Sequence, residues 1–260
     1  MRALEIKKET KSFPGLKKLI AVGLMIIFYI QLWGNSDQGF IEGTQLYVVA
    51  NSGLTMRMEP NKNSESLGIV DYGSVVEVLT QPDSIDYFER LNWVDGKWLY
   101  VEFDGVTGYM FDGYLSDLPM PIHEFEKCQL DFDFIYPLES WVDVNLGESE
   151  MNRVEAGLLT RITQEFSGGE KLVRSQKEDS YKLELYINDV RLMDAYHLLQ
   201  SMLDTKSRLE TFNSESTFIE DREGDLYKIK IDLDNPVEIR KLKSGAIKIT
   251  IRSDNYSCEL

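Results

Sequence analysis

An apolar run near the N-terminus constrains this chain more than any other feature. It extends from Leu19 to Trp33 and is interrupted only by the polar Gln31. Five lysines precede it: Lys7, Lys8, Lys11, Lys17 and Lys18. As a helix rising 1.5 Å per residue the run spans about 22 Å, somewhat short of the roughly 30 Å hydrocarbon core of a bilayer. Because the run has no polar face, it does not fit a buried helix of a soluble domain.

Two interpretations of this run stay open. As an uncleaved transmembrane helix over residues 19–34, it leaves residues 1–18 as a basic cytoplasmic segment, because basic residues flank the cytoplasmic end of such helices. The later residues then lie outside the cytoplasm, on a single-pass protein of the bacterial inner membrane. As a signal sequence, the run is cleaved at Gly34-Asn35-Ser36 and releases an exported soluble form. Trp33 is bulky for a residue before a cleavage site, so we expect the anchor.

The charge of the chain limits its partners. The chain has 28 basic and 44 acidic side chains, and its first 34 residues hold six of the basic and two of the acidic ones. The exported part therefore carries 22 basic against 42 acidic side chains. Nucleic acids and anionic lipid headgroups are bound mainly through clustered lysine and arginine. We expect no nucleic-acid partner, and membrane contact only through residues 19–34.

Cysteine and histidine are scarce. Cys128 and Cys258 both fall in the part expected to be exported, where a disulfide between them would stabilise the fold by about 4 to 5 kcal/mol. Two buried free thiols are the alternative. There is no C-x-x-C motif, and the histidines, His123 and His197, are far apart in the sequence. We predict neither a metal site nor a cofactor.

Residues 45–117 show the pattern of a small β barrel. Short alternating segments are separated by turn signals, among them Asn51-Ser52-Gly53, Asp71-Tyr72-Gly73 and the hairpin signal Asp104-Gly105. Pro119 and Pro121 follow, and two prolines so close together can continue neither a strand ladder nor a helix. The sequence therefore predicts a first exported domain that ends near residue 117.

These segments, in this order, resemble the bacterial SH3 family over about residues 46–116. The matching pieces are residues 50–57, Pro60, Leu67-Gly68, residues 72–78, 98–101 and 105–110, and Tyr114-Leu115. The resemblance implies an exported module that attaches to cell-wall peptides or glycan, or that mediates protein contacts beside an enzyme. One departure is the long connection of residues 81–97, which fits either an extended hairpin or a binding loop.

Aromatic side chains are the candidate ligand contacts, because they offer a large contact area at low entropic cost. Tyr87 and Trp93 on the long connection are expected to be exposed. For Tyr72, Trp98 and Tyr109 a place in the small barrel core is the competing interpretation.

The second exported region, residues 124–260, changes period. Apolar residues spaced by three and four predict a helix between Ser149 and Gly168, and a second helix after Asp189. Strict alternation predicts strands at residues 182–187, 216–219, 227–233 and 246–252. We therefore expect an α+β domain with two helices on an antiparallel sheet, after a mainly β barrel and one transmembrane helix.

No motif for catalysis is present. The sequence has no G-x-S-x-G, no H-E-x-x-H and no phosphate-binding loop, and Cys128 lacks the context of a nucleophile. We expect a non-catalytic, membrane-anchored envelope protein whose SH3-like domain recognises a cell-wall peptide or glycan, or a protein partner. The alternatives are a cell-wall hydrolase that uses carboxylates of the second domain, and a structural subunit of an envelope complex.

Overall fold

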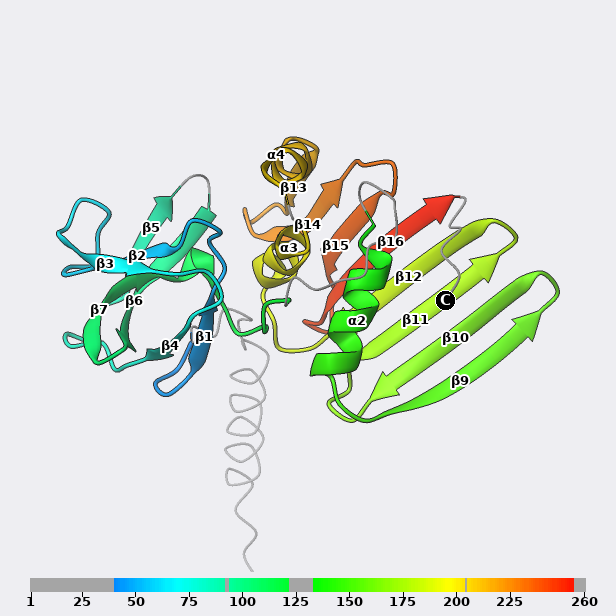
Figure 1. Ribbon diagram of the computed structural model, residues 1–260, viewed down its shortest axis with the longest axis horizontal. Coiled ribbons are helices and arrows are strands. Elements are labelled where there is room, and N and C mark those ends of the chain that lie inside the picture. Colours follow the sequence, from blue (N-terminus) through cyan, green and yellow to red (C-terminus); the bar gives the residue numbers. More distant parts are fainter. Residues whose placement is uncertain (1–39, 92–93, 122–132, 204, 255–260) are drawn as a thin grey trace, which may run out of the picture. The chain divides into compact units, whose positions relative to one another are not determined.

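Two eight-stranded sheets form the framework of the protein (Figure 1). The computed structural model describes residues 40–91, 94–121, 133–203 and 205–254. Residues from Phe40 onward cluster as one compact unit. The strand pairs of both sheets are antiparallel, which suits segments with one buried and one solvated face.

The first sheet forms the barrel. Its strand order is β3-β2-β7-β6-β4-β1-β8, and β5 pairs with β6. The strands are β1 (Gln45–Val48), β2 (Leu54–Arg57), β3 (Ser66–Val70), β4 (Val75–Val78), β5 (Tyr87–Leu91), β6 (Val94–Phe103), β7 (Val106–Phe111) and β8 (Leu115–Ser116), with the 3-10 helix η1 (Asp112–Tyr114) before the last strand.

Alternation along the strands builds the barrel core. Leu99 and Val101 of β6 point inward with Met110 of β7, and all three are buried. Gly108 lies between them and strand β2, where a Cβ atom would approach a side-chain carbon of Met56 to 2.7 Å. A glycine is therefore required at this position for the two strands to approach each other closely.

The second sheet contains the C-terminal half of the chain. Its strand order is β13-β14-β15-β16-β12-β11-β10-β9. The strands are β9 (Ser149–Ala156), β10 (Leu159–Phe166), β11 (Lys171–Lys177), β12 (Ser180–Ile187), β13 (Ser216–Glu220), β14 (Leu226–Ile231), β15 (Val237–Lys241) and β16 (Ile247–Asp254), and the helices are α2 (Ile135–Asn145), α3 (Leu192–Ser201) and α4 (Lys206–Ser214).

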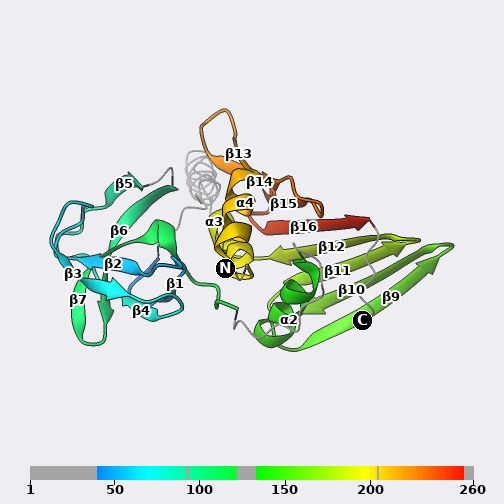
Figure 2. The ribbon, with the colours of Figure 1, turned by 45° about the horizontal axis from the view of Figure 1, so that its top comes forward.

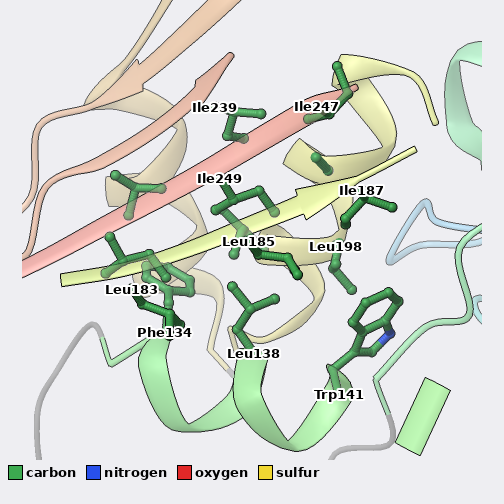
Figure 3. Packing of buried hydrophobic residues seen from close by; sticks show 14 of the residues in the cluster. Phe134, Leu138, Trp141, Leu183, Leu185, Ile187, Leu198, Ile239, Ile247 and Ile249 are labelled. Atoms are coloured by element: carbon green, nitrogen blue, oxygen red, sulfur yellow. The ribbon is translucent and has the colours of Figure 1, made fainter. Parts of the chain in front are cut away.

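Helices α2 and α3 pack on one face of this sheet (Figures 1 and 3). Leu138 of α2 and Leu198 of α3 join the inward-facing Leu185 and Ile249 in one core cluster, and each of the four is fully buried. Pro137 in the first turn of α2, followed by apolar residues at helical spacing, is the sequence signal for this helix, which the sequence analysis did not predict.

The predicted α+β class of the second domain is wrong. The described residues are mostly β, with three short α-helices, and the segment predicted as a helix between Ser149 and Gly168 is the hairpin β9–β10. Gly157 has φ of 63° and turns the chain there. Leu158 lies in this turn and Leu159 begins β10. With the apolar residues of the two strands they give a spacing of three and four residues that resembles a helical stripe. The second predicted helix corresponds to α3.

The predicted transmembrane helix is not supported by the structure. Residues 19–34 lie outside the described residues, and none of the helices that are described is long and apolar enough to cross a membrane.

Candidate binding surface on the barrel

The long connection between β4 and the middle of β6 is an extended hairpin. Strand β5 pairs with the first half of β6, from Tyr87 opposite Trp98 to Leu91 opposite Val94. Asp95-Gly96, which looks like a turn in the sequence, lies inside β6. A Cβ atom at Gly96 would lie 2.4 Å from Oδ1 of Asp112, so only glycine fits where the hairpin meets η1.

Three tyrosines lie together on this part of the barrel. Tyr87, Tyr100 and Tyr109 come from the neighbouring strands β5, β6 and β7. The ring centroids of Tyr100 and Tyr109 are 5.1 Å apart, and the ring of Tyr87 meets that of Tyr109 edge-on at 6.5 Å. Tyr109 is buried, whereas Tyr87 and Tyr100 are partly exposed. We call these three residues the tyrosine surface.

Polar partners fix the two exposed hydroxyl groups. The Tyr87 hydroxyl donates a short hydrogen bond to Asp83, and the Tyr100 hydroxyl donates to Oγ1 of Thr107 at 2.9 Å. The hydrogen bond lowers the pKa of Asp83 and raises the pKa of Tyr87. Asp83 therefore stays ionised beside the rings, and the surface combines aromatic faces with one negative charge.

Tyr87 and Tyr100 pack against a small second core, to which Tyr109 itself belongs. Trp98 and Phe111 face each other across β6 and β7, with ring centroids 5.8 Å apart. Trp98 is 2% exposed, and its indole Nε1 donates to Glu89 at 2.9 Å. The buried positions of Trp98 and Tyr109 favour the packing interpretation of these two candidates.

The other candidates do not join this cluster. Tyr72 is partly buried, and burial raises its pKa. Trp93 lies outside the described residues, and so do Cys128 and Cys258. The structure therefore brings Tyr87, Trp98 and Tyr109 together and separates Tyr72 from them. No cluster that could hold a metal ion occurs among the described side chains.

Phe88 points to the opposite side of the hairpin from Tyr87, because side chains alternate along a strand. It is 69% exposed, and Nζ of Lys97 lies over its ring at 4.8 Å. Phe88 is the most exposed aromatic side chain that the structure describes on the barrel. Phe88 is not among the aromatic residues predicted from the sequence as ligand contacts, although it stands next to Tyr87 in the long connection.

Helix α3 reaches the barrel through Arg191 and His197. The Arg191 guanidinium pairs with Asp194 at 2.7 Å and donates to the backbone carbonyl of Asp112. Nε2 of His197 lies 3.1 Å from the carbonyl oxygen of Gly113. His197 is buried, and burial lowers its pKa, so it is a packed neutral histidine at neutral pH.

The face of the second sheet that points away from the helices is basic, although the chain is acidic. Cross-strand pairing places five residues in one row over five strands: Lys228, Arg240, Lys248, Tyr186 and Lys171. Nζ of Lys171 and Nζ of Lys248 both lie over the Tyr186 ring, at 5.2 and 5.1 Å. The net charge of the chain therefore does not describe this face.

The comparisons with known proteins identify the barrel. Residues 52–116 match the family model of the bacterial SH3 domain, as the resemblance predicted. This stretch runs from the turn before β2 to β8 and contains all three residues of the tyrosine surface. This match suggests a binding module, of a class that often recognises cell-wall components. No curated protein and no solved structure shows significant similarity to the chain.

Proposed function

We propose that the tyrosine surface of the bacterial SH3 domain binds a cell-wall peptide or glycan. The observation that carries this proposal is the contact of three tyrosine rings on neighbouring strands, two of them partly exposed and beside the ionised Asp83. Aromatic faces suit the apolar face of a sugar ring, and a carboxylate suits the amino group of a peptide.

The proposed place of action is the bacterial cell envelope, outside the cytoplasm. The support is the sequence of residues 1–34, in which basic residues precede an apolar run, together with the matched bacterial SH3 domain. Membrane association through residues 19–34 would raise the local concentration of the domain near its wall ligand. In this proposal the protein is a recognition protein without catalytic activity.

Co-sedimentation of the full-length protein, kept in a mild non-ionic detergent, with insoluble peptidoglycan tests the proposal. We expect saturable binding that is about tenfold weaker in the double variant Tyr87→Ala/Tyr100→Ala. Phe88→Ala is the matched control, since it removes an aromatic ring from the same strand on the other side. Thermal melting verifies that each variant is folded.

Three results would contradict the proposal. Absence of saturable binding by the unaltered protein removes the wall ligand and favours a protein partner. Equal loss in Phe88→Ala removes the tyrosine surface as the site. Release of soluble peptidoglycan fragments during the incubation shows catalysis and contradicts the non-catalytic role.

A further inference from the structure

Strand β9 is an unusually exposed sheet edge. It ends the strand order of the second sheet, where its described partner is β10 alone, and all eight of its residues are exposed (Figures 1 and 2). Its exposed side chains include large apolar ones, since Met151 is 74% and Val154 is 53% exposed. An edge strand directs every second N–H and C=O group outward, so β9 offers hydrogen-bonding groups to another strand.

Several of the usual protections of an edge strand are missing from β9, although Glu150, Arg153 and Glu155 place charges of both signs on it. Proteins shorten such strands, interrupt them with bulges or place proline in them. Strand β9 pairs with β10 over eight residues without a register shift, and it contains neither proline nor glycine. The other edge of the sheet is different, because β13 has five residues and a register shift between Ile219 and Glu220. The outward backbone N–H and C=O groups of β9 are therefore accessible to a partner strand.

The residues of β9 are complementary to a second copy of the same strand. In an antiparallel pair of two β9 strands related by a two-fold axis at Val154, the two Val154 side chains lie opposite each other. Arg153 of each copy then lies opposite Glu155 of the other. Within one chain the same two side chains already form an ion pair, with Nη2 of Arg153 2.8 Å from Oε1 of Glu155, so both lie on the same face of β9.

Neighbouring registers lack this complementarity. A two-fold axis at Arg153 places the two Arg153 side chains opposite each other, and an axis at Glu155 does the same for two carboxylates. Like charges directly opposite in a ladder are destabilising. An axis at Asn152 places the apolar Val154 opposite the charged Glu150. Only the axis at Val154 pairs apolar with apolar and positive with negative side chains.

We infer that β9 is a self-association edge, at which a second copy of this chain pairs antiparallel about Val154. The pairing joins the second sheet of one copy to the second sheet of the other. The pairing extends over residues 152–156 of each copy. It uses the isologous contact of a two-fold dimer, in which the same residues of both copies meet. The inference is independent of the ligand that the barrel binds.

A charge-swap experiment on the full-length protein in mild detergent tests this pairing. Arg153→Glu places two carboxylates opposite each other in the dimer, and Glu155→Arg places two guanidinium groups opposite each other. We expect each variant alone to dimerise at least tenfold more weakly than the unaltered protein, as measured by sedimentation equilibrium. An equimolar mixture of the two variants restores opposite charges at both positions, and we expect it to form heterodimers.

The two variants control for each other. One makes the acidic chain more acidic and the other less acidic by the same amount, so an effect of net charge would move their dimerisation in opposite directions. Both positions are exposed, so folding is preserved. A monomeric unaltered protein at about 100 µM, variants that dimerise as well as the unaltered protein, or a mixture that stays monomeric would each overturn the inference.

Discussion

Arg191 and Asp112 lie 79 positions apart in the chain, yet Nη1 of Arg191 is 3.5 Å from Oδ2 of Asp112. The same guanidinium donates to the carbonyl oxygens of Asp112 and Leu115, pairs with Asp194, and lies 4.5 Å from the centroid of the Phe40 ring. One side chain thus connects the start of α3 with the end of the barrel. Burial raises the pKa of Asp112 even though Arg191 opposes this shift.

Removal of this guanidinium is expected to destabilise the protein. Arg191→Met leaves the buried carboxylates of Asp112 and Asp194 without their shared cation and should lower the free energy of unfolding by about 2 to 4 kcal/mol. Urea unfolding followed by tryptophan fluorescence measures the change. Arg222→Met, in the exposed turn before β14, is the control and should change stability by less than about 0.5 kcal/mol. Equal stability of the two variants would show that the contact contributes nothing.

Asp117 is expected to contribute less to stability at neutral pH than at acidic pH. Burial, with the nearby Asp194, raises the pKa of Asp117 to about 6, and among the described residues no hydrogen bond reaches its Oδ1. Because the folded state binds this proton more tightly than the unfolded state, the contribution of Asp117 to stability falls as pH rises from about 4 to 6.

Asp117→Asn should therefore stabilise the protein by about 1 kcal/mol at pH 7, and by nothing measurable near pH 3.5, where aspartate is protonated in both states. The effect is small because the carboxyl group is partly exposed and solvent screens it. Melting temperatures at the two pH values measure the effect. A loss of stability at pH 7 would show that the ionised carboxylate is needed.

The ion pairs around Glu184 should stabilise the second sheet in a pH-dependent way. Burial by itself would raise the pKa of Glu184, but hydrogen bonds from Lys248 and Lys182 outweigh it and lower this pKa. The lysine Nζ atoms lie 2.5 and 3.0 Å from its carboxylate oxygens. A lowered pKa gives stability that is present above the unfolded value and is lost as pH falls through the folded one.

Glu184→Gln should thus cost about 1 to 2 kcal/mol at pH 7, and the two proteins should converge near pH 3. Unfolding by urea at both pH values tests this. Glu223→Gln, in an exposed turn, provides the comparison and should have no effect. A cost that persists unchanged at pH 3 would show that the packing of the introduced amide, and not the lost charge, is responsible.

Gly96→Ala is expected to disturb the extended hairpin. The added methyl group would lie 2.4 Å from Oδ1 of Asp112 and 2.7 Å from Cζ of Phe111, so the hairpin and η1 must move apart. We expect a loss of about 1 to 3 kcal/mol, seen as a lower melting temperature. Asp95→Ala, which removes only an exposed ion pair with Arg90, should have a much smaller effect. If Gly96→Ala melts like Asp95→Ala, the close contact is not required for stability.

Local pattern was sufficient where a strand has one buried and one solvated face. Alternation along residues 182–187 predicted most of β12, and turn signals between short strands predicted the barrel that the bacterial SH3 family model matches. It failed at β9–β10. Because β9 is exposed on both faces, it lacks the alternation that marks a half-buried strand, and apolar residues around the turn resemble a helical stripe.

The sequence by itself determined the strand alternation, the turn positions and the aromatic content of the barrel, because each depends on the preferences of residues close together in the chain. Only the tertiary structure decided that Trp98 is buried while Phe88 is exposed, that Arg191 meets Asp112, and that Lys171 and Lys248 share one row. These relationships arise where distant segments pair or pack, and the free energy of such contacts depends on the whole fold.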